Sequence, residues 1–227
     1  MTIRETLTDA FQYADRNGIE VPLGLYTRAR KVGVFKAQED IGEINAAYHN
    51  AVTESLVTYF EGGTVAGPRN KFRQSTTEAF YDAFYLGWKD GGGGVPDEDG
   101  LAWLQARISQ ELGFVDMLFQ QAKELRKEPD FDFFSWVTAR ADGYIRTVKE
   151  IYNSAFVRSS KDIMVTFVGD DGAESCTDCQ QYKGKRHKMS WFASRNAIPP
   201  FGTGLECHPG GRCQHYLMND KGEAVTL

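Results

Sequence analysis

Hydrophobic residues recur every three or four positions through most of the first 160 residues, which places them on one side of a helix. This spacing predicts helices over about 38–60 and 69–89, with Gly62-Gly63 between them. The apolar stripe of the second helix consists mainly of aromatic rings, which are typical of a packed core. A shorter amphipathic helix is expected over residues 1–16 and ends at Asn17-Gly18.

Two longer helices are predicted over 101–126 and 133–158, where the apolar residues keep the helical spacing almost throughout. Pro129 interrupts the pattern, so these two helices are expected to pack antiparallel across a turn. The glycines Gly91–Gly94 separate them from the earlier pair. Four consecutive glycines disfavour a helix, and no Lys-Ser/Thr follows as in a phosphate-binding loop. We therefore expect a flexible loop there.

The pattern changes after Lys161. Apolar residues alternate over 163–168, which predicts a strand, and glycine, proline and turn residues are frequent from there to residue 213. A segment of this length and composition buries little core by itself. The predicted fold class is mainly α: a helical N-terminal domain with long antiparallel helices (residues 1–160), followed by a small Cys-rich, loop-and-strand, metal-binding module (residues 161–227).

The composition is that of an ordinary folded protein, with 41% hydrophobic and 25% charged residues among 227. The net charge of −5 argues against a general nucleic-acid coat, which is expected to be basic. No stretch approaches the roughly 18 to 20 apolar residues of a membrane span, so no membrane partner is expected. The first residues do not form a secretory signal. We therefore expect a reducing compartment, in which the cysteines are not paired as disulfides.

All four cysteines, Cys176, Cys179, Cys207 and Cys213, fall in one window near the C-terminus. The Cys-x-x-Cys spacing of the first two directs two thiolates toward one point, which is half of a tetrahedral metal site. Cys207 and Cys213, or Cys213 and a histidine, would supply the other half, and His208 is the alternative ligand. Zinc is the usual metal of such a site, so we expect structural Zn²⁺. Cysteines without a metal, and a redox-active Cys-x-x-Cys, are the alternatives.

No catalytic constellation accompanies these cysteines. Four thiolates would close the zinc shell, whereas catalytic zinc keeps an open position and a general base nearby. A nucleophile pair of Cys207 and His208 is disfavoured, because adjacent side chains tend to project apart. No residue is therefore predicted to be catalytic, and the protein is not expected to be an enzyme.

A basic run lies in the same window and consists of Lys183, Lys185, Arg186 and Lys188. A run of this kind beside a metal knuckle can contact DNA phosphates. The interpretation we favour is a solvated hairpin tip, because residues 161–227 carry eight basic and eight acidic side chains.

The C-terminal third resembles the minor head proteins of tailed bacteriophages, the head-morphogenesis family typified by the F protein of phage Mu. In that family a helix-rich region leads to a strand with an acidic turn, a Cys-x-x-Cys, a Gly-Lys turn, a Pro-Pro and a His-Pro-x-Cys-Arg-Cys signature. The corresponding segments here are Val165–Asp171, Cys176–Cys179, Gly184-Lys185, Pro199-Pro200 and His208–Cys213. The resemblance covers roughly residues 135–217.

The sequence departs from the family pattern around the last signature. Gly211 stands where the family has its first signature cysteine, and Cys207 precedes the histidine, where no cysteine is usual. The segment Phe201–Glu206 is also inserted. These departures affect which residues would bind the metal more than they affect the resemblance to the family.

The resemblance implies a structural minor head (capsid) protein that acts in head morphogenesis by binding the portal protein, the major capsid protein or both. Such a protein is made in the host cytoplasm and located in the virion head, with the metal module as a rigid docking knob. A homo-oligomer is compatible with long, aromatic-rich helices. The basic run is the only feature of the sequence that supports contact with DNA.

A metal-dependent nuclease with a structural zinc site is the alternative function. It needs ligands for a second metal, and the candidates are His187, His208, His215, Asp170 and Asp171. A host-encoded regulatory zinc protein is a third alternative, which the net acidity and the lack of a helix-turn-helix signature disfavour.

Overall fold

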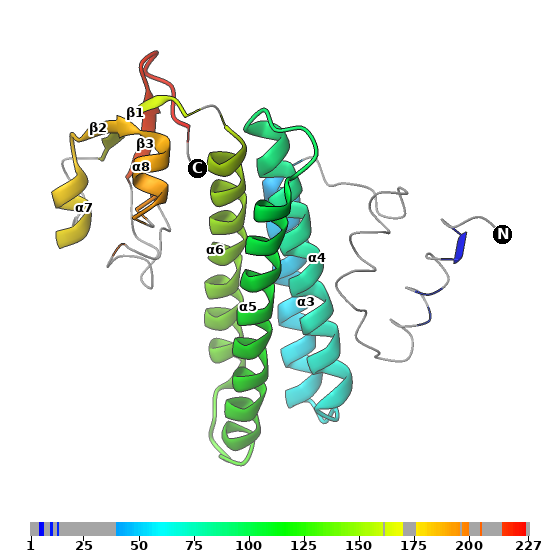
Figure 1. The fold of residues 1–227 in the computed structure, drawn as a ribbon. Coiled ribbons are helices and arrows are strands. Elements are labelled where there is room, and N and C mark those ends of the chain that lie inside the picture. The colour runs from blue at the N-terminus through cyan, green and yellow to red at the C-terminus, as the bar shows by residue number, and fades with distance from the viewer. Residues whose placement is uncertain are drawn as a thin grey trace. The chain divides into compact units, whose positions relative to one another are not determined.

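The computed structural model describes residues 5, 6, 10, 13, 40–160, 162–169, 176–195, 197–199, 205 and 215–225. Over these residues the protein is mainly helical, with one small sheet near the C-terminus (Figure 1). The mainly α fold class with a short strand-bearing segment is therefore confirmed, whereas metal binding by that segment stays a prediction. Most of the helix predicted over 1–16 lies outside the described residues.

The long helices are α3 (Ile41–Phe60), α4 (Ala66–Asp90), α5 (Glu98–Leu125) and α6 (Phe133–Ser159). Their ends lie within three residues of those predicted from the hydrophobic spacing. Side-chain caps set two of the starts. The Asp40 carboxylate accepts the N–H groups of Gly42 and Glu43 before α3, and Asp132 accepts the N–H of Ser135 before α6. No described helix combines the length and the apolar content that crossing a membrane requires.

Close contacts divide the chain into two compact units. The first contains residues 1–82 and 101–144, and the second contains residues 83–100 and 145–227. The helices α4, α5 and α6 each run from one unit into the other. The domain boundary predicted after residue 160 stays a prediction.

In the first unit, segments of all four long helices form a closed bundle. The Tyr48 hydroxyl bonds that of Thr76 at 2.9 Å, which joins α3 to α4, and Arg73 donates to Asp116 at 2.7 Å, which joins α4 to α5. Contacts of Arg140 with Gln121 and of Asp142 with His49 join α6 to α5 and to α3. The pairing of Gln121 with Arg140 across the Pro129 turn confirms that α5 and α6 run antiparallel here.

The centre of this bundle combines rings with polar groups. Tyr48 is fully buried among the rings of Phe72, Phe80 and Tyr144, and burial raises its pKa well above the ordinary value. Burial, and then the charge of Glu111, also raise the pKa of Tyr144. Glu111 is itself buried and lies 3.5 Å from Arg107. These hydroxyls therefore act as neutral hydrogen-bonding groups.

In the second unit, the end of α4 lies directly against the end of α6. A Cβ built at Gly87 would lie 2.2 Å from the carbonyl oxygen of Tyr152, so only glycine permits this approach. Gly91 meets Ser159 and Phe156 in the same way, and Gly93 meets Trp88, whereas a Cβ at Gly92 or Gly94 would meet nothing within 4 Å. Two of the four glycines therefore allow close packing, which the run of glycines alone does not indicate.

A three-stranded antiparallel sheet completes the second unit. Its order is β2-β1-β3, with β1 (Met164–Val168) between β2 (Arg186–Lys188) and β3 (Tyr216–Asn219). The strand predicted over 163–168 is confirmed as β1. Two short helices, α7 (Thr177–Tyr182) and α8 (Met189–Ala193), flank β2 in sequence.

One face of β1 is buried, because Val165 and Phe167 alternate with partly exposed residues. These two side chains belong to one buried cluster with Cys179, Met189, Phe192 and Leu217, and with Val157 from the end of α6. The sequence led us to expect little core in this segment. The segment buries more core than expected. Its buried residues occur singly among turn residues, so no periodic pattern in the sequence reveals them.

Candidate functional site

The candidate site is the cysteine module, which we define as the described residues between 162 and 225. Cys176 is the N-cap of α7, and its Sγ accepts the N–H of Cys179 at 3.4 Å. A single turn therefore holds both cysteines. Cys179 is buried in the module core and Cys176 is half-buried. This geometry agrees with the first half of the predicted zinc site.

The second half of that site lies outside the described residues, because it consists of Cys207, Cys213 and the alternative ligand His208. Within the part of the chain that the structure describes, no three His, Cys, Asp or Glu side chains are grouped so that they could hold a metal ion. The full ligand set therefore stays a prediction.

The Gly-Lys turn that follows the Cys-x-x-Cys is tied to the central strand. Gly184 has a φ of +77°, which glycine adopts readily, and its N–H donates to the Phe167 carbonyl at 2.9 Å. The Phe167 N–H in turn donates to the Lys185 carbonyl at 3.0 Å. The strand, the knuckle and the Gly-Lys turn, three segments on which the family resemblance depends, thus lie together.

His215 is a buried histidine at the other edge of β1. It directly precedes β3, and its ring lies 5.4 Å from that of Phe167. A Cβ at Gly169 would lie 2.0 Å from the His215 ring, so glycine is what makes room for the imidazole. The ring of Phe167 and the missing Cβ at Gly169 both contribute to the burial of this side chain.

His187 has a different environment on β2. Its ring stacks on Trp191 at 3.9 Å between centroids, and the Arg195 guanidinium lies 3.9 Å from the centroid of the same indole. The indole is therefore held between a histidine and an arginine. Cation–π attraction stabilises such an arrangement modestly.

Two of the three histidines named for the nuclease alternative, His187 and His215, do not converge. His187 pairs with Val165 on one side of β1, whereas His215 precedes the strand on the other side. Two strand spacings of about 4.8 Å and four residues of about 3.3 Å put their Cα atoms roughly 16 Å apart. The rings of Phe167 and Phe192 lie between them. The other candidates, Asp170, Asp171 and His208, lie outside the described residues.

The four predicted DNA-contacting side chains are exposed, and acidic side chains pair with two of them. Arg186 donates to both oxygens of Asp220 at 2.7 to 3.1 Å, and these contacts raise its pKa. Lys188 lies 3.4 Å from Asp162, and Lys185 lies over the ring of Tyr182. Lys183 is exposed at the end of α7. Because acidic partners offset two of the four charges, this arrangement favours the solvated hairpin tip over a phosphate-binding surface.

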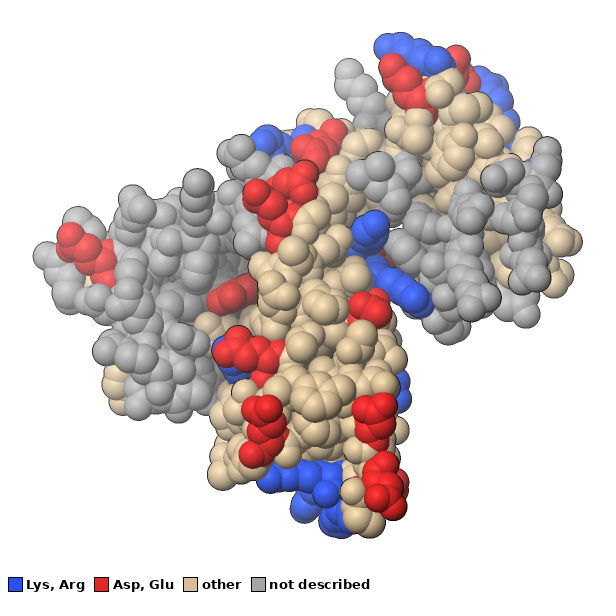
Figure 2. All heavy atoms as spheres, turned by 180° about the vertical axis from the view of Figure 1, so that it is seen from behind, with Lys and Arg blue, Asp and Glu red and all other residues tan. Residues whose placement is uncertain are grey.

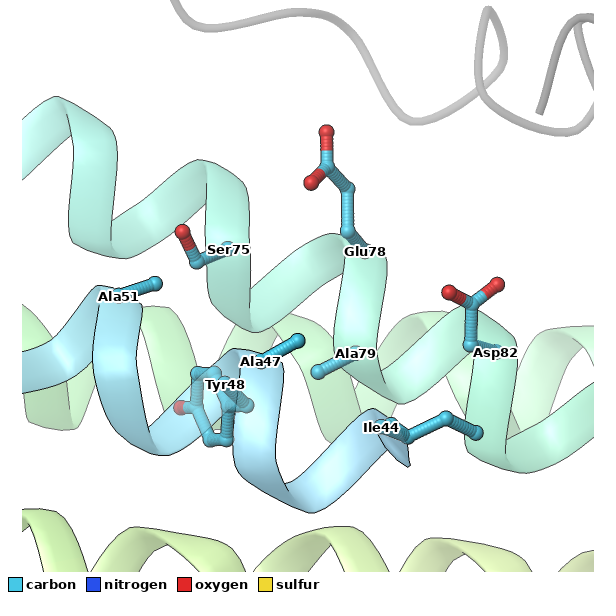
Figure 3. A pocket seen from close by; sticks show the side chains of 8 residues that line it. All are labelled: Ile44, Ala47, Tyr48, Ala51, Ser75, Glu78, Ala79 and Asp82. Atoms are coloured by element: carbon cyan, nitrogen blue, oxygen red, sulfur yellow. The ribbon is translucent and has the colours of Figure 1, made fainter. Parts of the chain in front are cut away.

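Sequence reasoning did not identify a pocket of about 100 Å³ between α3 and α4 in the first unit. Small side chains leave the space, and Ser75, Glu78 and Asp82 point to the same side of α4 (Figure 3). Glu78 accepts a hydrogen bond from Gln74 at 3.2 Å. The signal available in the sequence was the spacing of Ala47 and Ala51, which lie one turn apart and directly precede the core residues Tyr48 and Val52. Alanines of this kind are common on helices and do not by themselves indicate a pocket.

On the face shown in Figure 2, acidic side chains are scattered along the helices, and basic side chains gather at the lower end and also lie beside the middle of the helices. In the comparisons with known proteins, no family model, curated protein or solved structure matches the chain.

Proposed function

We propose that the chain is a structural minor head protein of a tailed bacteriophage, acting in head morphogenesis by binding the portal protein, the major capsid protein or both. One observation carries the proposal. Three segments that match the family pattern, the strand, the Cys-x-x-Cys and the Gly-Lys turn, lie in one module and are joined by backbone hydrogen bonds and a shared core. Segments with that shared position are expected if the resemblance reflects a common fold.

In this proposal the module is the part of the chain that docks on the portal or capsid protein, and a bound zinc ion stabilises its fold. Cys176 and Cys179 form the first half of the site, as their shared turn supports. Cys207 and Cys213 supply the second half, with His208 as the alternative ligand. The bound ion would join parts of the chain that are far apart in sequence, and a structural ion of this kind contributes directly to folding.

The separation of His187 from His215 favours the structural role over the nuclease alternative. A second metal would need side chains that converge, and these two are held apart by phenyl rings. A purely structural protein requires no such convergence.

The test is the composition of purified particles. From the phage that encodes the chain, mature heads and DNA-free precursor heads are purified, and the chain and the portal protein are quantified by mass spectrometry with isotope-labelled standards. We expect a fixed ratio of the chain to portal in at least one particle type. A chain absent from both particle types would contradict the proposal.

A nuclease assay provides the second arm. The purified chain is incubated with plasmid DNA and Mg²⁺ or Mn²⁺, alongside His187→Ala, which changes a half-buried stack at the edge of the module core. We expect no cleavage above that of the buffer. Cleavage that requires the metal ion and is abolished in His187→Ala would overturn the structural assignment.

A further inference from the structure

The pocket between α3 and α4 has a largely apolar floor and one acidic side. Glu78 and Asp82 lie one helical turn apart on α4 and point to the same side (Figure 3). Both residues are half-buried. The floor is formed by five other lining residues: Ile44, Ala47, Tyr48, Ala51 and Ala79. An occupant that matches both parts carries a positive charge on an apolar stem.

The chain contains a segment of this chemistry directly before α3. Residues 25–36, which we call the basic segment, read Leu-Tyr-Thr-Arg-Ala-Arg-Lys-Val-Gly-Val-Phe-Lys and lie outside the described residues. They include four basic side chains and no acidic one. Apolar residues are interspersed with these charges, so the segment offers cations and apolar side chains together.

We propose that the basic segment docks in the α3–α4 pocket of its own chain, with cationic groups beside Glu78 and Asp82. Guanidinium and ammonium groups form strong, charge-assisted hydrogen bonds with carboxylates. Their long stems are apolar and cover the alanines of the floor. The pocket volume of about 100 Å³ suits one long side chain, whereas sites for drug-sized ligands measure about 300 to 1,000 Å³.

The length of the chain permits this contact. Lys31 precedes Asp40, the cap of α3, by nine residues, which span up to about 30 Å when extended. The lining residues of α3 lie only about 5 to 15 Å from the start of the helix. Asp82 lies at the Ile44 end of the pocket (Figure 3), so a chain that leaves the start of α3 meets this carboxylate first.

Charge and tethering select this segment over other occupants. Two carboxylates repel nucleic acid and other anions. A cationic segment of another molecule has to compete with one that a short linker holds at an effective concentration of about a millimolar. The second basic run, residues 183–188, is less suited, because acidic partners already pair with Arg186 and Lys188.

Trypsin tests the docking directly, because it cleaves after Arg28, Arg30 and Lys31 themselves. The full chain and a synthetic peptide of residues 20–40 are digested side by side, and mass spectrometry follows cleavage at these bonds. Cleavage follows the population of the open form, so a segment docked for about nine-tenths of the time is cleaved about tenfold more slowly than the peptide. Equal rates in the chain and the peptide would overturn the proposal.

A charge-removing variant assigns the protection to the pocket. Glu78→Gln/Asp82→Asn keeps the shape of the acidic side, and we expect it to speed cleavage of the basic segment at least about threefold, the effect of losing two half-buried ion pairs. Glu54→Gln, a matched change at an exposed position of α3 outside the pocket, is expected to leave the rate unchanged. Circular dichroism checks that each variant is folded. A Glu78→Gln/Asp82→Asn segment cleaved as slowly as that of the wild type would show that it docks elsewhere.

A zero-length cross-link identifies the partners. A water-soluble carbodiimide joins a lysine to a carboxylate that it contacts, and the pair of Lys71 and Glu54, 2.7 Å apart, is the positive control. Mixed unlabelled and isotope-labelled chains distinguish links within one chain from links between copies. We expect a lysine of the basic segment to link to Glu78 or Asp82 within one chain. If only the control link forms, or if the new link forms only between copies, the proposal is overturned. This inference does not depend on the phage assignment.

Discussion

The bundle of the first unit and the core of the cysteine module are held together over different distances along the chain. In the bundle, long helices present a repeating apolar side, and the segments of the α3–α4 and α5–α6 pairs are joined by short turns. In the module, β1 pairs with a strand about twenty residues later and another about fifty residues later. Packing of the helices can therefore stabilise the bundle without a metal ion. The module gains more folding free energy from a metal ion, because the ion would join segments that are distant in sequence.

The largest expected effect concerns the bundle. Leu56 is fully buried on α3, and Leu56→Asp places an unpaired charge in the core. We expect a loss of about 4 kcal/mol or more in the free energy of unfolding. Urea denaturation followed by far-UV circular dichroism measures it, with the exposed Thr58→Asp on the same helix as control. Similar midpoints for the two variants would mean that the α3 stripe does not stabilise the bundle.

The next effect separates the two regions. Cys179→Ser is expected to remove the zinc and to loosen the module, so that the amides of β1 lose hydrogen-exchange protection while those of α3 keep theirs. Chelation of the wild type is expected to have the same outcome, and chelation of Cys179→Ser to add nothing. If chelation leaves the protection of β1 unchanged, the module does not depend on a metal.

A smaller effect tests the packing of His215. Gly169→Ala brings a methyl group against the imidazole and is expected to cost about 1 to 3 kcal/mol of module stability. Gly143→Ala is the control, because a Cβ there meets nothing within 4 Å, and a helical alanine is expected to stabilise by up to about 1 kcal/mol. Thermal melts followed by tryptophan fluorescence compare them. If Gly169→Ala leaves the melting temperature unchanged, the His215 ring does not pack against Gly169 as described.

The smallest effect is electrostatic. The N–H of Ser190 donates to Asp162 at 3.0 Å, and this hydrogen bond, helped by Lys188, lowers the pKa of that carboxyl. A lowered pKa in the folded state gives stability that is present above the unfolded pKa and is lost as the pH falls through the folded value. The melting temperature should therefore decline in acid partly because of Asp162. The melting temperature of Asp162→Asn should fall less steeply with decreasing pH than that of the wild type. If the two melting temperatures fall in parallel, the Asp162 carboxylate does not contribute to the pH dependence.

The sequence predicted the helices well because their signal is local. The spacing of apolar residues in α3 through α6 depends on neighbours three or four positions apart, so no knowledge of the fold was needed. The strand β1 was also visible as an alternation of residues. The strands β2 and β3 are three and four residues long, and their partners are distant in sequence, so no local pattern defines them.

The candidate site was predicted in part for the same reason. The Cys-x-x-Cys spacing is local chemistry, and the structure gives it the turn with an N–H donated to sulfur. The separation of His187 from His215 and the pairing of Arg186 with Asp220 depend on the order of strands around β1, which the sequence did not reveal.

The most direct test of the contrast between the bundle and the module is the metal content of the protein. The chain is purified under reducing conditions without chelator, and its mass is measured by native mass spectrometry beside the Cys179→Ser and His187→Ala variants. We predict one zinc ion per chain, lost in Cys179→Ser and retained in His187→Ala, whose ring stacks on Trp191 rather than on the knuckle. A wild-type chain without metal, together with a Cys179→Ser variant of equal stability, would contradict the account.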